Sequence, residues 1–181
     1  QHALKKHFYA ACDSYRQQLA GIGKRQHALQ LQELARRAQL CARLEADPSA
    51  AHVTAAQEQW QQQGLPPEWE RAIDARRQHA IAAAEGTPPD LAANEERLRE
   101  LCIAMEILLD ADTPEEDRQR RRDYQMRRLQ QGLGQAAGNP REQQEQLLVQ
   151  WHCTGSASPA VQASLQTRFD AAQKPGAAQR V

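Results

Sequence analysis

The sequence predicts an all-α protein: an elongated array of antiparallel helical hairpins or coiled-coil-like helices joined by Pro/Gly breaks. Ala and Gln contribute 32 and 26 of the 181 residues, and Ala has the highest intrinsic helix propensity. Only four Val, five Ile and five Thr are available for strands. This shortage excludes a β-sandwich, a barrel and a parallel sheet, which need many β-branched positions. Because large apolar residues are few, we expect long helices that pack through narrow apolar stripes.

Pro, Gly and small polar residues divide the chain into eight expected helices. Pro is favoured at helix starts and Gly at helix ends, which sets the boundaries, including a break at Gly21-Ile22-Gly23. The expected helices are residues 1–20, 24–46, 49–63, 67–84, 90–110, 114–131, 141–151 and 158–173. The best-defined start is Thr113-Pro114-Glu115-Glu116, where Thr113 would cap the helix and Glu116 would complete a capping box.

Internal similarity divides these helices into units. Leu40-Cys41-x3-Glu45 recurs as Leu101-Cys102-x3-Glu106, and Trp60-x3-Gly64-x-Pro66 recurs as Trp151-x3-Gly155-x3-Pro159. Ile73 and Phe169 then follow as corresponding large apolar residues. We therefore expect a first helical unit over 1–48, truncated at its N-terminus, a second over 49–139 that contains the basic helix 114–131, a partial third over 140–174, and a flexible tail over 175–181.

Several motifs together resemble a known family. They are Phe8-Tyr-Ala-Ala-Cys-Asp13 with Tyr15, the two tryptophan motifs, Leu101–Glu106 followed by Thr113–Asp117, and Tyr124-Gln-Met-Arg-Arg-Leu129. With them the chain resembles the bacterial helical-repeat proteins catalogued as domain of unknown function 349. The resemblance implies tandem helical repeats, the C-terminal part of a long cytoplasmic protein, and no established enzymatic activity. Ile73, where Phe is usual, and Asp74-Ala75-Arg76 depart from the pattern.

The charges balance, with 23 basic and 23 acidic residues, but they are segregated along the chain. The formal charge is +4 over 1–47, −5 over 48–109, −5 over 110–117 and +6 over 118–141. At about 100° per residue, one face of the basic helix carries four arginines and a tyrosine, opposite Met126 and Leu129. The residues of this arginine face are Arg120, Arg121, Tyr124, Arg127 and Arg128.

The arginine face has two interpretations. Arginine forks bind phosphates and a tyrosine ring stacks on an unpaired base, which would suit RNA or single-stranded DNA. Alternatively, the face is an ordinary solvated surface or a lid over an acidic neighbouring helix.

No catalytic residue, metal ligand or cofactor site is predicted. Cys12, Cys41, Cys102 and Cys153 form no C-x-x-C pair and indicate reduced, mostly packed thiols. The histidines lack zinc-site spacing, and neither a phosphate-binding loop nor a nucleophile elbow occurs. No apolar run reaches about 18 residues and no signal peptide opens the chain, so we expect a cytoplasmic location without membrane contact.

These observations favour a non-catalytic helical-repeat interaction or scaffold module that docks onto a protein partner or assembly, with no small-molecule substrate. The alternative is binding of RNA or single-stranded nucleic acid through the Arg-rich helix 118–128. Binding through several phosphates would weaken by orders of magnitude as salt rises, and this separates the two hypotheses.

Overall fold

The computed structural model describes residues 2–60, 64–132 and 139–174, and within these residues the chain contains helices and no strand. The prediction of an all-α protein is therefore confirmed. The elements are α1 (His2–Ala46), α2 (Ala50–Glu58), α3 (Pro67–Ala84), α4 (Leu91–Leu108), a 3-10 turn η1 (Glu115–Asp117), α5 (Arg118–Gly132), α6 (Pro140–Cys153) and α7 (Pro159–Ala172). The predicted tail, 175–181, lies outside the described residues.

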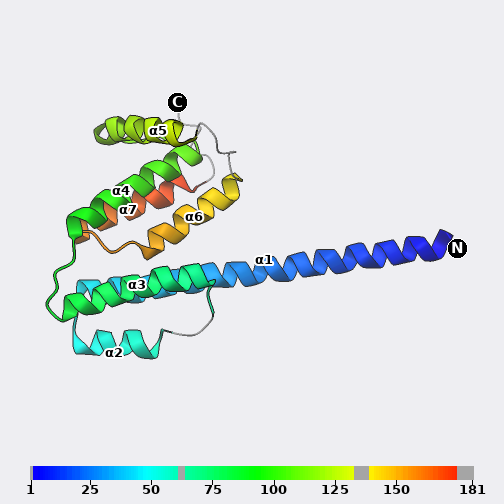
Figure 1. Cartoon of the computed structure of the whole chain (residues 1–181), viewed down its shortest axis with the longest axis horizontal. Coiled ribbons are helices and arrows are strands. Elements are labelled where there is room, and N and C mark those ends of the chain that lie inside the picture. Colours follow the sequence, from blue (N-terminus) through cyan, green and yellow to red (C-terminus); the bar gives the residue numbers. More distant parts are fainter. Residues whose placement is uncertain (1, 61–63, 133–138, 175–181) are drawn as a thin grey trace.

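The first two expected helices are one continuous helix, α1, so the predicted break at Gly21-Ile22-Gly23 is wrong. A glycine inside a helix costs only about 1 kcal/mol relative to Ala, and the helix-forming residues on both sides outweigh two such losses. α3, α6 and α7 each have Pro in their first turn, whereas no Pro occurs in α1. Figure 1 shows the N-terminal half of α1 extending beyond all the other helices.

The predicted capping box before α5 does not form either. Pro114 is the residue before η1, no side chain caps this turn, and α5 begins only at Arg118. The Thr113 hydroxyl instead donates a hydrogen bond to Glu106 at 2.6 Å and accepts one from Arg121 at 2.7 Å. Tertiary contacts to α4 and α5 have taken the place of the local cap.

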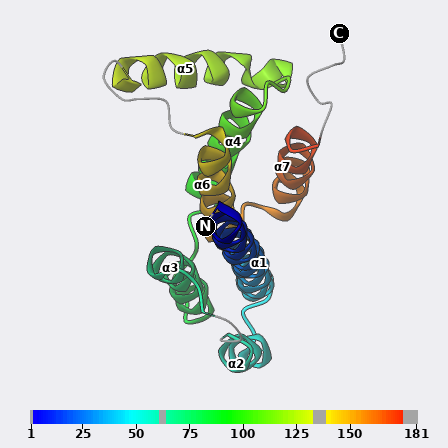
Figure 2. The same cartoon turned by 90° about the vertical axis from the view of Figure 1, so that its right-hand side faces the viewer.

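The helices pack in two groups, one of α1, α2 and α3 and one of α4, α6 and α7 (Figures 1 and 2). In each group the first and last helices run in the same direction. Glu70 of α3 contacts Arg37 of α1, and farther along both helices Arg76 contacts Glu45. In the same way, α7 runs parallel to α4. The expected division at residue 48 separates α1 from α2, and the one at residue 139 separates α4 from α6. Each division therefore falls between two helices of the same group.

The internal similarity corresponds to equivalent contacts. Glu45 on α1 forms an ion pair with Arg76 on α3, and Glu106 on α4 forms an ion pair with Arg168 on α7. Each glutamate follows its buried cysteine by four residues. These pairs align Ile73 with Leu165, three residues before each arginine, rather than with Phe169 as the sequence comparison suggested.

Both repeated tryptophans are buried, as core packing predicts. The Trp151 ring stacks on Phe169 with centroids 4.0 Å apart, and Trp60 lies beneath the guanidinium groups of Arg37 and Arg77. Cys41 and Cys102 are buried free thiols, and burial raises the pKa of each to about 12. These cysteines therefore serve as small apolar residues of the core, as predicted.

Candidate functional site

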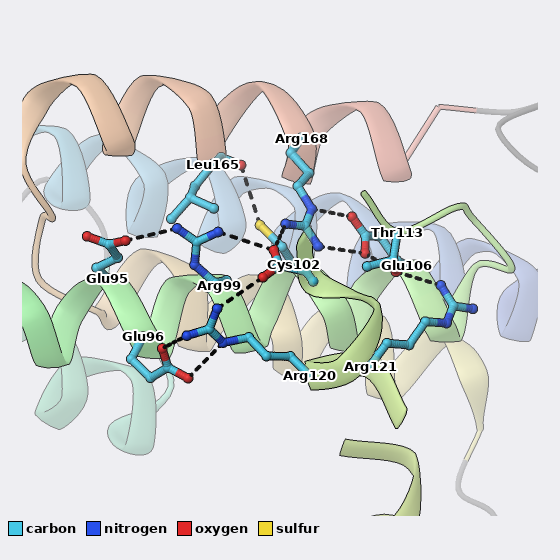
Figure 3. Close-up of polar contacts among 11 residues, drawn as sticks. Glu95, Glu96, Arg99, Cys102, Glu106, Thr113, Arg120, Arg121, Leu165 and Arg168 are labelled. Carbon is cyan, nitrogen blue, oxygen red and sulfur yellow. Dashed lines mark hydrogen bonds and ion pairs between the residues drawn. The ribbon is translucent and has the colours of Figure 1, made fainter. Parts of the chain in front are cut away.

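The basic helix α5 is anchored to α4 and α7 by a network of ion pairs centred on Asp117, and Figure 3 shows its arginines Arg99, Arg120 and Arg168. The turn η1 places Asp117 at full burial, where Arg99 of α4, Arg168 of α7 and Arg120 of α5 all donate to its carboxylate. Arg168 also donates two hydrogen bonds to buried Glu106. Three helices are thus fixed to one another by a single acidic side chain.

The network is charged at neutral pH. Burial alone would raise the pKa of Asp117, but the hydrogen bonds from Arg168 and Arg99 lower it below its usual value. For Arg168, burial acts to lower the pKa, while the hydrogen bonds that it donates to Glu106 and Asp117 raise it. Each buried carboxylate therefore has a guanidinium partner, and the network acts as an internal clamp with no unpaired charge to offer a ligand.

Two arginines of the predicted face pair with acidic side chains of α4, and a third contacts the segment that follows α4. Arg120 donates to Glu96 at 3.0 Å and Arg127 to Glu100 at 2.7 Å. Arg121 donates to the carbonyl of Ala111 at 2.7 Å and is half-buried. These contacts favour the second interpretation of the sequence, in which the arginines cover an acidic neighbouring helix.

The exposed side chains of α5 include both charged and apolar ones. Tyr124 is half-buried and lies 5.9 Å below the guanidinium of Arg127, while Arg128 is exposed. Met126 and Leu129 are 58% and 67% exposed. Arg120, Arg127 and Arg128 are exposed to solvent, as expected, while Arg120 and Arg127 also pair with acidic side chains of α4. The apolar Met126 and Leu129 are exposed as well.

A second candidate surface lies on the N-terminal half of α1. Six residues with alternating spacings of three and four form a continuous line, here called the α1 seam: Cys12, Tyr15, Leu19, Ile22, Gln26 and Leu29. Tyr15, Leu19, Ile22 and Leu29 are 62%, 49%, 51% and 49% exposed. In heptad terms, Cys12, Leu19 and Gln26 occupy positions a, and Tyr15, Ile22 and Leu29 occupy positions d. Such a line is the pairing surface of a coiled coil.

Sequence reasoning missed this surface because it ended a helix at Gly21-Ile22-Gly23. The spacing itself is present in the sequence, and Leu19 and Ile22 lie on either side of the supposed break. Once α1 is continuous, the two short apolar patterns become one seam of about two and a half heptads. The motif Phe8–Asp13 belongs to this helix, although the Phe8 side chain lies outside the described residues.

Comparisons of the chain with protein-family models, curated proteins and solved structures find no match. The resemblance to the helical-repeat family named above accordingly stays a prediction. What the chain does must be inferred from its two candidate surfaces and from its buried groups.

A groove of about 1190 Å³ is lined by residues of α1, α3, α4, α6 and α7, about a third of them alanines. Two of its lining residues, Arg76 and Glu45, form an ion pair with each other. Burial raises the pKa of Cys153 to about 11, so its thiol stays protonated at neutral pH. Among the described residues, no group of His, Cys, Asp and Glu could hold a metal ion, and no helix is long and apolar enough for a membrane span.

His152, at the edge of this groove, makes stability pH-dependent. Burial lowers its pKa from 6.5 to about 4, and the charge of Arg76 acts in the same direction. Because the unfolded chain takes up a proton near pH 6.5 and the folded chain only near 4, stability is complete above pH 6.5 and falls as the pH drops through this window. We expect His152 alone to reduce the free energy of unfolding by roughly 2–4 kcal/mol across it.

Urea unfolding of the wild type and of His152→Gln at several pH values between 7 and 4 measures this effect. The variant should have a flatter profile, while His79→Gln, which changes an exposed histidine, should follow the wild type. Parallel profiles for the wild type and His152→Gln would contradict the assignment.

Proposed function

We propose that this chain is a non-catalytic helical interaction module that docks onto a protein partner through the α1 seam. The observation that carries the proposal is the row of large apolar side chains on a helix that extends beyond the packed body (Figure 1). The resemblance to a cytoplasmic helical-repeat family agrees with this role and implies a cytoplasmic location.

The physical argument is the cost of leaving the seam in water. Full burial of one Leu or Ile side chain is worth about 1.5–3 kcal/mol, and the seam carries Leu19, Ile22 and Leu29 together with Tyr15, each about half exposed or more. Contiguous apolar patches on protein surfaces are typical of interaction sites. A partner helix that covered the seam would recover much of this free energy and would support the isolated half of α1.

Binding of RNA or single-stranded DNA through α5 is the second candidate. Arg128 is exposed, and Arg120 and Arg127 remain about half exposed despite their ion pairs, so a phosphate could reach them. Each of the two would have to exchange a carboxylate of α4 for a phosphate. This competition lowers the affinity that α5 can offer and makes protein docking the favoured proposal.

Co-purification tests the proposed function. We expect the tagged 181-residue chain to recover a defined protein after nuclease treatment, and the variant Leu19→Glu/Ile22→Glu to lose it, because two carboxylates would be buried in the interface. The matched control, Gln17→Glu/Lys24→Glu, adds the same side chains at positions outside the seam on the same segment. It should recover the protein as the wild type does.

Two results would count against docking through the seam. One is recovery of the same proteins by the wild type and by Leu19→Glu/Ile22→Glu. The other is recovery of nucleic acid without a protein. If this nucleic acid is lost when the four arginines of the arginine face (Arg120, Arg121, Arg127 and Arg128) are replaced by Gln, the second candidate is established instead. Circular dichroism of each variant checks that α1 stays helical.

A further inference from the structure

We infer that the α1 seam pairs with an acidic amphipathic helix of another protein and forms a two-stranded coiled coil with it. This inference rests on the proposed function and adds the chemistry of the partner. It follows from three observations: the charges of the segment that carries the seam, the interhelical pair that α1 forms at Arg37, and the charge of a second copy.

The segment that carries the seam is basic. Residues 5–29 contain five basic side chains (Lys5, Lys6, Arg16, Lys24 and Arg25) and a single acidic one, Asp13. In the heptad, Arg16 occupies position e and Arg25 position g, so one arginine lies on each edge of the seam. Side chains at e and g face those of the partner helix and select it by charge. Both edges therefore favour carboxylates.

The chain itself shows one interhelical pair of this kind. Arg37 lies three heptads beyond Arg16, at the same position e, and is buried where α3 packs against α1. Glu70 of α3 accepts a hydrogen bond from Arg37 at 2.6 Å. The apolar line itself does not continue there, because the a and d positions after Leu29 are Glu33, Arg36, Leu40 and Arg43. What α3 illustrates is the pairing of an arginine at position e with a glutamate of a neighbouring helix.

The partner helix would cover the α1 seam from Cys12 to Leu29. Opposite Arg16 it would present a carboxylate, as α3 presents Glu70 to Arg37. Within the part of the chain that the structure describes, Arg16 pairs with Asp13 at 3.2 Å, and such an exposed local pair contributes little. Exchange of Asp13 for an interhelical carboxylate therefore costs little.

A second copy of the chain is a poorer occupant. Two copies of the segment 5–29 would bring together ten basic and two acidic side chains, so the two strands repel each other. In a parallel pair, the polar Gln26 residues would also face each other at an a position, where a polar residue lowers stability. An acidic helix removes the repulsion and satisfies both edges.

Two synthetic four-heptad peptides test the inference against the whole 181-residue chain. Both carry Ile at a and Leu at d, and they differ only at e and g, with Glu in one and Lys in the other. Fluorescence anisotropy at low salt should show that the Glu peptide binds at least about tenfold tighter than the Lys peptide, a preference that shrinks as salt screens the charges.

Variants identify the surface and the charges. The variant Leu19→Glu/Ile22→Glu should no longer bind the Glu peptide. The variant Arg16→Glu/Arg25→Glu should reverse the preference, so that the Lys peptide binds tighter than the Glu peptide. Gln17→Glu/Lys24→Glu, the control outside the seam, should keep the preference for the Glu peptide. Its affinity should drop by less than that of Arg16→Glu/Arg25→Glu.

Three results would overturn the inference: equal binding of the two peptides, binding of neither, or a wild-type dimer in sedimentation that Leu19→Glu/Ile22→Glu dissociates. In the last case the occupant is a second copy. The proposed function is judged separately by co-purification. If co-purification recovers a protein that Leu19→Glu/Ile22→Glu loses, but neither peptide binds, the proposed docking is supported and the inferred acidic coiled coil is contradicted.

Discussion

Replacement of Arg168 by Met is expected to destabilise the protein by about 3–5 kcal/mol. Arg168 is the cation shared by Glu106 and Asp117, both of them buried, and the substitution would leave these two carboxylates close together without it. Met fills a similar volume, so the loss reports the missing charge rather than a cavity. Arg99 and Arg120 still contact Asp117, but within the described contacts of Glu106 only the Thr113 hydroxyl remains.

Urea unfolding at pH 7 of the wild type and Arg168→Met measures this loss. Arg97→Met is the matched control, because Arg97 forms an exposed ion pair with Glu100 on the same helix, and such pairs contribute about 1 kcal/mol or less. A loss below about 1 kcal/mol in Arg168→Met would show that the clamp around Asp117 contributes no more than a surface pair.

Replacement of Arg76 by Met should have an effect of the same size, about 3–5 kcal/mol. Arg76 donates twice to Glu45, at 2.8 and 2.9 Å, and once to the carbonyl of His152 at 2.7 Å. Glu45 in turn accepts from the backbone and the hydroxyl of Ser156. Arg76 thereby links α1 and α3 to the segment after α6, so its loss disturbs both helical groups.

Amide hydrogen exchange distinguishes this link from a purely local ion pair. In Arg76→Met, exchange should accelerate in residues 152–157 as well as around Glu45, because both sides lose their common donor. Arg76→Lys should be intermediate, since an ammonium keeps the charge but not the planar fork. A variant with wild-type stability and unchanged exchange near Ser156 would contradict the assigned link.

The fold class was predictable from composition, and the repeated Leu-Cys-x3-Glu motif identified positions that are equivalent in space. Both depend on local propensity and on patterns within one helix. The late start of α5 after Thr113 was not predictable, because the Thr113 hydroxyl forms tertiary hydrogen bonds with Glu106 and Arg121 and does not cap the helix. A cover over an acidic helix was one of the two interpretations of α5, but local patterns could not identify α4 as the helix that presents Glu96 and Glu100 to the arginines.

The candidate docking surface was missed for a different reason. The spacing of Tyr15, Leu19 and Ile22 was readable, but Gly21 and Gly23 were weighed as helix ends without a Pro to support them. A break should have been expected only where a local penalty exceeds the propensity of its neighbours, and two glycines in a chain of Ala, Gln and Leu do not reach that level.

The most direct test of the central claim, that the α1 seam is the docking surface, is amide hydrogen exchange on the complex recovered by co-purification. Relative to the free chain, exchange in residues 12–29 should slow by at least about tenfold, because a paired helix opens less often. Exchange in α5 should be unchanged. If exchange slowed in α5 and stayed unchanged in residues 12–29, the result would contradict this claim and would place the partner on α5.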